Sequence, residues 1–179
     1  MDLIELYRYF AKFVPLDVLK KNYVKTPNDR SEAASIQEEV LGDQSTHRID
    51  SIGEYLFMGD GDFILQRLRN SNKQILMVDS DRLNYEPNSD NGSKLSIGLS
   101  VCEHYNRSNT DVVSELATQN RCLETLKGIL KVIKEDYSDD GCEPCLIDGD
   151  FEVRFLDAKA LNGLIGYTAF FTITAPTYE

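Results

Sequence analysis

Three pairs of aspartates, each pair separated by one residue, are the first candidates for chemistry: Asp60/Asp62, Asp79/Asp81 and Asp148/Asp150. Paired carboxylates hold Mg²⁺ in enzymes that transfer phosphoryl groups or cut nucleic acids. Such nucleases usually add a lysine, whereas the nearest candidate cation around the last pair is Arg154. Because the chain has 30 acidic residues, an ordinary acidic surface also explains these pairs. A metal-dependent (Mg²⁺ or Zn²⁺) enzyme, such as a nuclease using the aspartate pairs, is therefore kept as an alternative function.

The second candidate is a zinc or redox site at Cys142 and Cys145, which form a C-x-x-C motif. Cys102 and His104 can complete a four-ligand set of the kind that zinc prefers. Their spacing is poor, since residues two apart on a strand share a face but must both reach one ion. A thioredoxin-like site places the pair before a helix, whereas here the pair follows a helix and precedes a strand. We predict no bound zinc and four reduced cysteines.

Residues 136–141 begin like a calcium-binding loop, with oxygen ligands at positions 1, 3 and 5 and glycine at position 6. Position 12 is Ile147, which cannot supply the bidentate carboxylate, and position 8 is the polar Glu143. No second helix is predicted after this segment. The sequence therefore predicts a polar loop that leaves a helix.

The two histidines, His47 and His104, lie far apart in the sequence, and no serine stands in a Gly-x-Ser-x-Gly motif. A hydrolase triad cannot be assembled from such local signals. We predict a protein that is not an enzyme, with no catalytic, cofactor-binding or metal-binding residues.

The first 70 residues read mainly as helix. Leu3, Leu6 and Phe10 recur at spacings of three and four, which is typical of an amphipathic helix. Similar signals predict helices over 2–14, 16–19, 31–41, a short one ending at Phe57, and 63–69.

The rest of the chain reads as strand, strand, long helix, strand, strand. Apolar residues alternate with polar ones through Leu95, Ile97, Leu99 and Val101, which is the pattern of a strand with one buried face. We predict strands over 74–78, 94–102, 151–155 and 167–174, a loop over 79–93 and a helix over 110–137.

One apolar seam is predicted along the long helix, through Val112, Leu116, Leu123, Leu126, Leu130, Ile133 and Tyr137. Leu116, Leu123, Leu130 and Ile133 are expected to face the strand residues Leu95, Ile97, Leu99, Phe151, Val153, Tyr167 and Phe171. The predicted fold class is α+β, with about four mainly antiparallel strands packed on one long helix. Residues 1–70 form an N-terminal helical extension and 71–179 the α+β domain. Polar segments 79–93 and 136–150 are expected to be interaction or mobile surfaces.

The charge and the hydrophobicity of the chain limit the kinds of partner that it can bind. The 179-residue chain carries a net charge of −11, which opposes direct binding to nucleic-acid phosphates unless the bases cluster. The densest group of bases is only Arg67, Arg69 and Lys73. No apolar run approaches the ~18 residues of a transmembrane helix, and Met1 to Leu6 lack the basic start of a secretory signal. We therefore expect no sequence-specific nucleic-acid binding and no membrane span.

In its order of elements, the region 60–176 resembles bacteriophage tail-completion, tail-terminator and neck proteins. The likeness lies in the strand Ile75–Val78, the acidic loop, the strand Leu95–Val101, the long helix, and a last strand from Gly166-Tyr167 to Pro176. The resemblance implies a non-enzymatic virion protein that forms a homo-oligomeric ring, often a hexamer, and joins other tail or neck proteins. It also implies location in the virion, and in the host cytoplasm during assembly. The alternatives are a metal-dependent or redox enzyme and an intracellular adaptor domain.

Overall fold

The computed structural model describes residues 3–23, 32–57, 73–84, 93–105, 111–138, 146–156 and 163–175. The helices in these ranges are α1 (Leu3–Ala11), α2 (Leu16–Asn22), α3 (Glu32–Gly42) and α5 (Val112–Ser138). The strands are β1 (Ile52–Phe57), β2 (Gln74–Asn84), β3 (Ser93–His104), β4 (Leu146–Leu156) and β5 (Leu164–Ala175). In this part of the chain, no helix is both long enough and apolar enough to cross a membrane.

The fold is α+β, as predicted, but its sheet has five strands in the order β1-β2-β3-β5-β4. β1 and β2 run parallel, whereas the other three pairs are antiparallel, so the sheet is mixed. The additional strand is β1, where the sequence analysis predicted a short helix ending at Phe57. That prediction was wrong because both faces of β1 are buried: Tyr55 packs into one apolar cluster and Leu56 into another. Burial on two faces removes the alternation that identifies a strand.

β2 and β4 are longer than predicted. β2 continues through Asn84 and pairs with β3 as far as Asn84 opposite Lys94, so residues 79–84 are strand and not loop. β4 begins at Leu146, so 146–150 are also strand and not acidic turn. Pairing with a neighbouring strand outweighs the weak strand propensity of these polar residues. Residues 85–92, 139–145 and the predicted helix 63–69 lie outside the described part of the chain.

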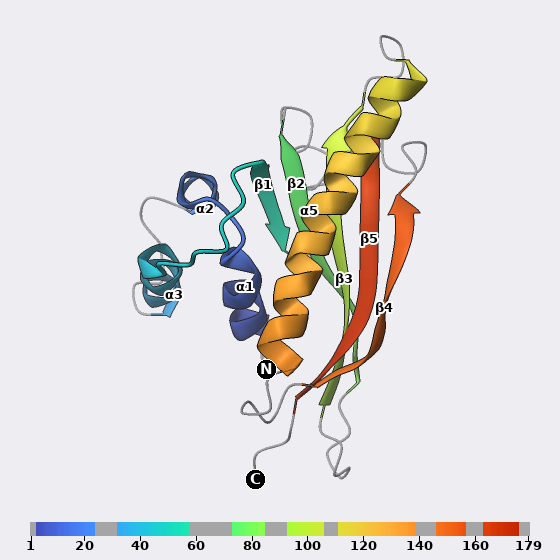
Figure 1. Cartoon of the computed structure of the whole chain (residues 1–179). Coiled ribbons are helices and arrows are strands. Elements are labelled where there is room, and N and C mark those ends of the chain that lie inside the picture. Colours follow the sequence, from blue (N-terminus) through green and yellow to red (C-terminus); the bar gives the residue numbers. More distant parts are fainter. Residues whose placement is uncertain are drawn as a thin grey trace.

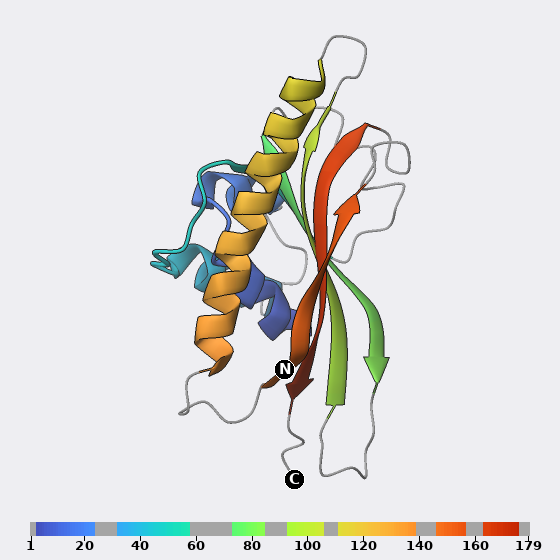
Figure 2. The same cartoon turned by 45° about the vertical axis from the view of Figure 1, so that its right-hand side comes forward.

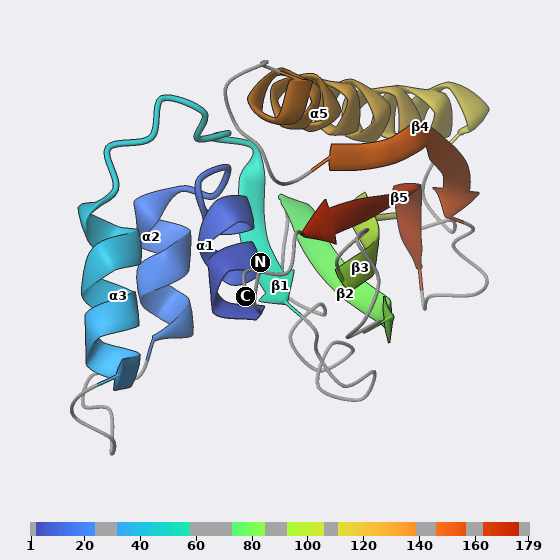
Figure 3. The ribbon, with the colours of Figure 1, turned by 90° about the horizontal axis from the view of Figure 1, so that it is seen from below.

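The helices and the sheet form two layers (Figure 1). Seen from below, α5 lies over the sheet, and α1, α2 and α3 stand beside it, next to β1 (Figure 3). One apolar cluster joins all of these elements. Its residues include Phe10 of α1, Leu19 of α2, Val40 of α3, Leu76 of β2 and Leu126 of α5. The N-terminal helices therefore share the hydrophobic core of the sheet.

The buried seam of α5 is turned relative to the predicted one. Cys122, Leu126, Ile129 and Ile133 are fully buried, whereas Leu123 is only half-buried and Leu116 is 57% exposed. Spacings of four, three and four along a straight helix keep the buried residues on one face. The N-terminal turns of α5, which include Leu116, extend beyond the ends of the strands (Figure 2). The prediction that Leu116 faces the sheet was therefore wrong.

The face of the sheet opposite α5 carries a smaller apolar cluster of Leu56, Ile75, Cys102 and Leu164. Beside it, the hydroxyls of Ser100 and Thr168 lie 2.7 Å apart in a buried hydrogen bond. These contacts tie the central strands β3 and β5 together on the side that α5 does not cover.

A polar contact fastens α1 to the last turns of α5. The Tyr9 hydroxyl donates to Asp136 Oδ2 over 2.7 Å, and the Lys12 ammonium forms an ion pair with the same oxygen. Lys12 Nζ also lies 3.9 Å from the centre of the Tyr9 ring. Burial alone raises the pKa of Asp136, but the hydrogen bonds from Lys12 and Tyr9 outweigh it, so the pKa is lowered overall.

We expect Asp136→Asn to destabilise the protein by about 1 kcal/mol at neutral pH, since the carboxylate is partly exposed. A carboxyl whose pKa is lower in the folded state stabilises the fold above its unfolded pKa of about 4. That stabilisation is lost as the pH falls through the folded value. Urea unfolding of both proteins at several pH values should therefore show the difference at pH 7 and its decline below about pH 4. Glu135→Gln is the control, because Glu135 makes only an exposed ion pair with Lys131. A difference that persisted unchanged in acid would contradict the prediction.

Candidate assembly surface

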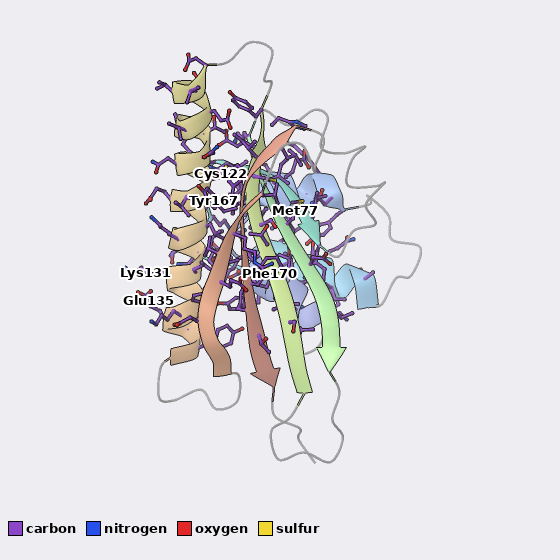
Figure 4. The ribbon with its side chains drawn as sticks, turned by 90° about the vertical axis from the view of Figure 1, so that its right-hand side faces the viewer. Met77, Cys122, Lys131, Glu135, Tyr167 and Phe170 are labelled. Carbon is purple, nitrogen blue, oxygen red and sulfur yellow. The ribbon has the colours of Figure 1, made fainter. Side chains whose placement is uncertain are left out.

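The two edge strands of the sheet, β1 and β4, differ in how far other elements cover them. Along β1, the Asn22 side chain of α2 donates a 3.1 Å hydrogen bond to the Tyr55 carbonyl, and α2 packs against the strand. β4 forms the opposite edge, and Figure 4 faces it directly. In the ranges that the structure describes, no helix or strand lies along this outer side of β4. An uncovered edge offers unpaired backbone N–H and C=O groups to another chain.

Two apolar side chains of β4 are exposed on the face that carries α5. Val153 stands opposite Ala169 and Phe155 opposite Tyr167, and both β5 partners contact the main core. Because β4 lies at the edge, α5 covers these residues incompletely: Val153 is 41% and Phe155 48% exposed. The Phe155 ring rests on the Tyr167 ring, with centroids 5.6 Å apart. A fixed aromatic side chain that is half in water is typical of an interface residue.

The other face of β4 is charged. Glu152 and Arg154 form an ion pair of 2.7 Å along the strand, and both side chains are more than half exposed. The Arg154 guanidinium lies 5.3 Å from the centre of the Phe170 ring on β5, and Phe170 is itself 41% exposed. Figure 4 shows Phe170 beside the β4 edge. We call Glu152, Val153, Arg154, Phe155 and Phe170 the edge surface.

A second exposed apolar group lies on the first turns of α5. Val112, Val113 and Leu116 are 72%, 75% and 57% exposed. They belong to the end of the helix that extends past the strands, so the sheet gives them no apolar cover (Figure 2). Clustered apolar side chains in water favour contact with another molecule.

Comparisons with protein-family models, with curated proteins and with solved structures found no match for this chain. The edge surface offers backbone hydrogen bonds, two charges of opposite sign and three exposed apolar side chains. Together these groups suit contact with a protein strand.

Of the four residues that were considered as zinc ligands, two lie in the described part of the chain. Cys102 is buried on the face of the sheet opposite α5, and its sulfur lies 4.0 Å from the Ile75 carbonyl oxygen. His104 is exposed at the end of β3. Cys142 and Cys145 lie outside the described residues. Within those residues, no three side chains of histidine, cysteine, aspartate or glutamate gather as a metal site.

The aspartate pairs are not brought together. Asp79 and Asp81 belong to β2, whereas Asp148 and Asp150 belong to β4, and β3 and β5 separate these strands. Three strand spacings amount to about 14 Å, which is too far for one shared cation. Asp60 and Asp62 lie outside the described ranges. Of the calcium-like loop, Asp136 is held by Lys12 and Tyr9, and Ile147 lies in β4.

The two histidines occupy different parts of the fold. His47 is exposed in the segment between α3 and β1, near the Phe13 ring, and His104 ends β3. Burial lowers the pKa of His104. Of the densest basic group, Lys73 is exposed and donates to the Asp50 carbonyl, while Arg67 and Arg69 lie outside the described residues.

The two described cysteines, Cys102 and Cys122, are free thiols and fully buried. Burial raises the pKa of Cys122 to about 12, and burial raises that of Cys102 well above its usual range. Since the thiolate is the reactive form, both should react slowly in the folded protein.

We expect a Cys142→Ser, Cys145→Ser chain to react with Ellman's reagent far more slowly when native than in urea. Its two remaining thiols should both titrate after denaturation. Adding Lys127→Cys on the exposed face of α5 supplies a fast-reacting internal control. Rapid labelling of the native chain without that cysteine would show that Cys102 or Cys122 is accessible.

Proposed function

We propose that this protein is a non-enzymatic structural protein of phage or prophage type, which joins or forms a ring at the tail or neck of the particle. The observation that carries the proposal is the open β4 edge with the half-exposed Val153 and Phe155. A protein that works by assembly must present a surface that is incomplete by itself, and among the described residues this edge has no backbone or apolar partner on its outer side.

Charge supports the same role. A net charge of −11 repels DNA over about one Debye length, roughly 8 to 10 Å. A ring of such subunits would have a lumen that does not hold a passing DNA molecule. In this proposal the partners are further copies of the chain and other tail or neck proteins, met in the host cytoplasm and kept in the virion.

The proposal is tested by native mass spectrometry and electron microscopy of the chain, alone and mixed with tail-tube or neck subunits from phage-type particles. We expect a defined assembly in the mixture, even if the isolated chain is small, because a tube end can act as the template. Phe155→Lys should weaken the assembly, whereas Leu3→Lys should not, since Leu3 is similarly exposed, at 52%, but lies on α1.

A different result would favour the alternative enzyme. The proposal fails if the chain ignores these subunits and turns over a nucleotide or nucleic acid in a Mg²⁺-dependent reaction. Replacing Asp79 and Asp81, and separately Asp148 and Asp150, would then identify the carboxylates responsible.

A further inference from the structure

The β4 edge is the uncovered edge of the described sheet, and its residues have a self-complementary order. From position 150 to position 156 the strand reads Asp-Phe-Glu-Val-Arg-Phe-Leu. It contains no proline, which would block pairing on the free side. Charged residues often protect an edge from pairing, but here one acid and one base flank a central valine.

We propose that β4 pairs antiparallel with β4 of a second copy, around a two-fold axis through Val153. In this arrangement Glu152 of each copy stands opposite Arg154 of the other, which gives two cross-strand ion pairs on one face. Opposite charges directly across an antiparallel pair are stabilising, and like charges are destabilising. The charges of β4 are therefore complementary to those of a second, antiparallel β4.

Neighbouring registers are unfavourable. A two-fold axis perpendicular to the sheet keeps each side chain on the same face of the sheet in both copies. Directly opposite residues share a face, so the axis must pass through a residue, and the alternative registers differ in which residue this is. An axis through Glu152 sets two glutamates opposite each other, and an axis through Arg154 sets two arginines opposite each other. An axis through Phe151 places Asp150 opposite Glu152. An axis through Glu152 also sets Asp150 opposite Arg154, but it keeps the pair of glutamates. In the range 151 to 154, only the axis through Val153 pairs opposite charges without setting any like charges opposite each other.

The same register also covers the apolar side of the strand. It sets Val153 opposite its own copy, and Phe155 of each chain opposite Phe151 of the other, which lies at the end of the register shift that β4 makes between Asp148 and Glu152. Aromatic pairs directly across two strands contribute to sheet stability. The exposed parts of Val153 and Phe155, 41% and 48%, would be buried by these contacts.

The long helices leave room for this contact. α5 packs mainly over β3 and β5, so the two copies of α5 would be separated by roughly four strand spacings, or about 19 Å. Packed helices need only about 8 to 10 Å. The space between the two helices lies over the two β4 strands. The side chains of Val153 and Phe155 from both copies would point into this space. The result is a ten-stranded sheet with both α5 helices on one face, since each copy contributes five strands.

This inference rests on β4 and does not depend on the phage role. A two-fold contact closes on itself, so a larger ring would need a second contact elsewhere on the chain. An apolar surface for such a second contact is offered by the exposed residues Val112, Val113 and Leu116 of α5.

The test is sedimentation velocity of the full chain over a range of concentrations at physiological ionic strength. We expect a concentration-dependent dimer. Glu152→Arg and Arg154→Glu should each weaken self-association by about tenfold or more, because each sets like charges opposite one another twice. An equimolar mixture of the two variants should dimerise again, since the heterodimer restores opposite charges at every position. The double variant, Glu152→Arg with Arg154→Glu, should also dimerise.

Glu124→Arg and Lys127→Glu are matched controls, because these residues form an exposed ion pair of 2.9 Å on α5. They should leave the dimer unchanged, and circular dichroism should show that all variants are folded. The inference is overturned if the unmodified chain stays monomeric, if the single β4 variants associate normally, or if their mixture stays monomeric. A monomer that still joins tail subunits would overturn this inference and leave the proposed function standing.

Discussion

Replacing Gly166 with alanine is expected to destabilise the protein by about 3 kcal/mol or more. Gly166 lies in β5 opposite Cys102 of β3. A Cβ atom at this position would stand 2.1 Å from the Val101 carbonyl oxygen and 2.6 Å from the Cys102 Cα. Both neighbours are backbone atoms of a central strand, so no side-chain rotation can relieve the clash. Strands β3 and β5 would have to separate at this position.

Gly128 provides the matched control for this change. It lies in the middle of α5, and a Cβ atom there meets nothing within 4 Å. Alanine has the higher helix propensity, so Gly128→Ala should stabilise the protein by about 0.5 to 1 kcal/mol. Urea unfolding of the two variants should therefore move the midpoint in opposite directions. A Gly166→Ala protein as stable as the unmodified chain would show that β3 and β5 are not this close.

Replacing Phe10 with alanine is expected to cost about 3 to 5 kcal/mol. The Phe10 side chain is fully buried in the cluster that joins α1 to the sheet and to α5. Removing its ring leaves a cavity among side chains that come from several elements, and such a site cannot collapse easily. Because the helices and the sheet share this core, the loss should affect the whole protein and not only the first residues.

The measurement is unfolding followed both by far-ultraviolet circular dichroism and by thiol accessibility of Cys102. Cys102 lies on the opposite face of the sheet, so it reports on the sheet alone. Both signals should shift together in Phe10→Ala. Leu3→Ala, at a 52% exposed position of the same helix, should shift neither by much. If only the helical signal changed, the N-terminal helices would be a separately folding unit.

Strong periodicity predicted the parts of the fold that depend on one buried face. β3 has a regular apolar alternation and α5 a long seam, and both were found close to their predicted bounds. β1 was missed because Tyr55 and Leu56 are buried on opposite faces. The polar end of β2 was missed because its strand conformation comes from pairing with β3, which local sequence does not reveal.

The candidate surface could not have been located from sequence alone. The order Glu152, Val153, Arg154, Phe155 is visible as alternation, but alternation is the same in a central strand and in an edge strand. The decisive fact is that β5 inserts between β3 and β4, which leaves β4 outermost. Sequence alone also could not show which side of α5 faces the sheet, because the buried Cys122 and Ile129 are as apolar as the residues of the predicted seam.

The late position of β5 in the chain has a consequence for biosynthesis. β5 follows every other strand in sequence but lies between β3 and β4, where it supplies both of them with a partner. Until residues 164–175 have left the ribosome, β3 lacks one of its two neighbours and β4 lacks the strand it pairs with in the described sheet. Such contacts between distant segments form slowly, and unpaired strands associate with those of other chains in the meantime. A nascent chain that is stalled or cleaved before residue 164 should therefore be a substrate for chaperones and proteases.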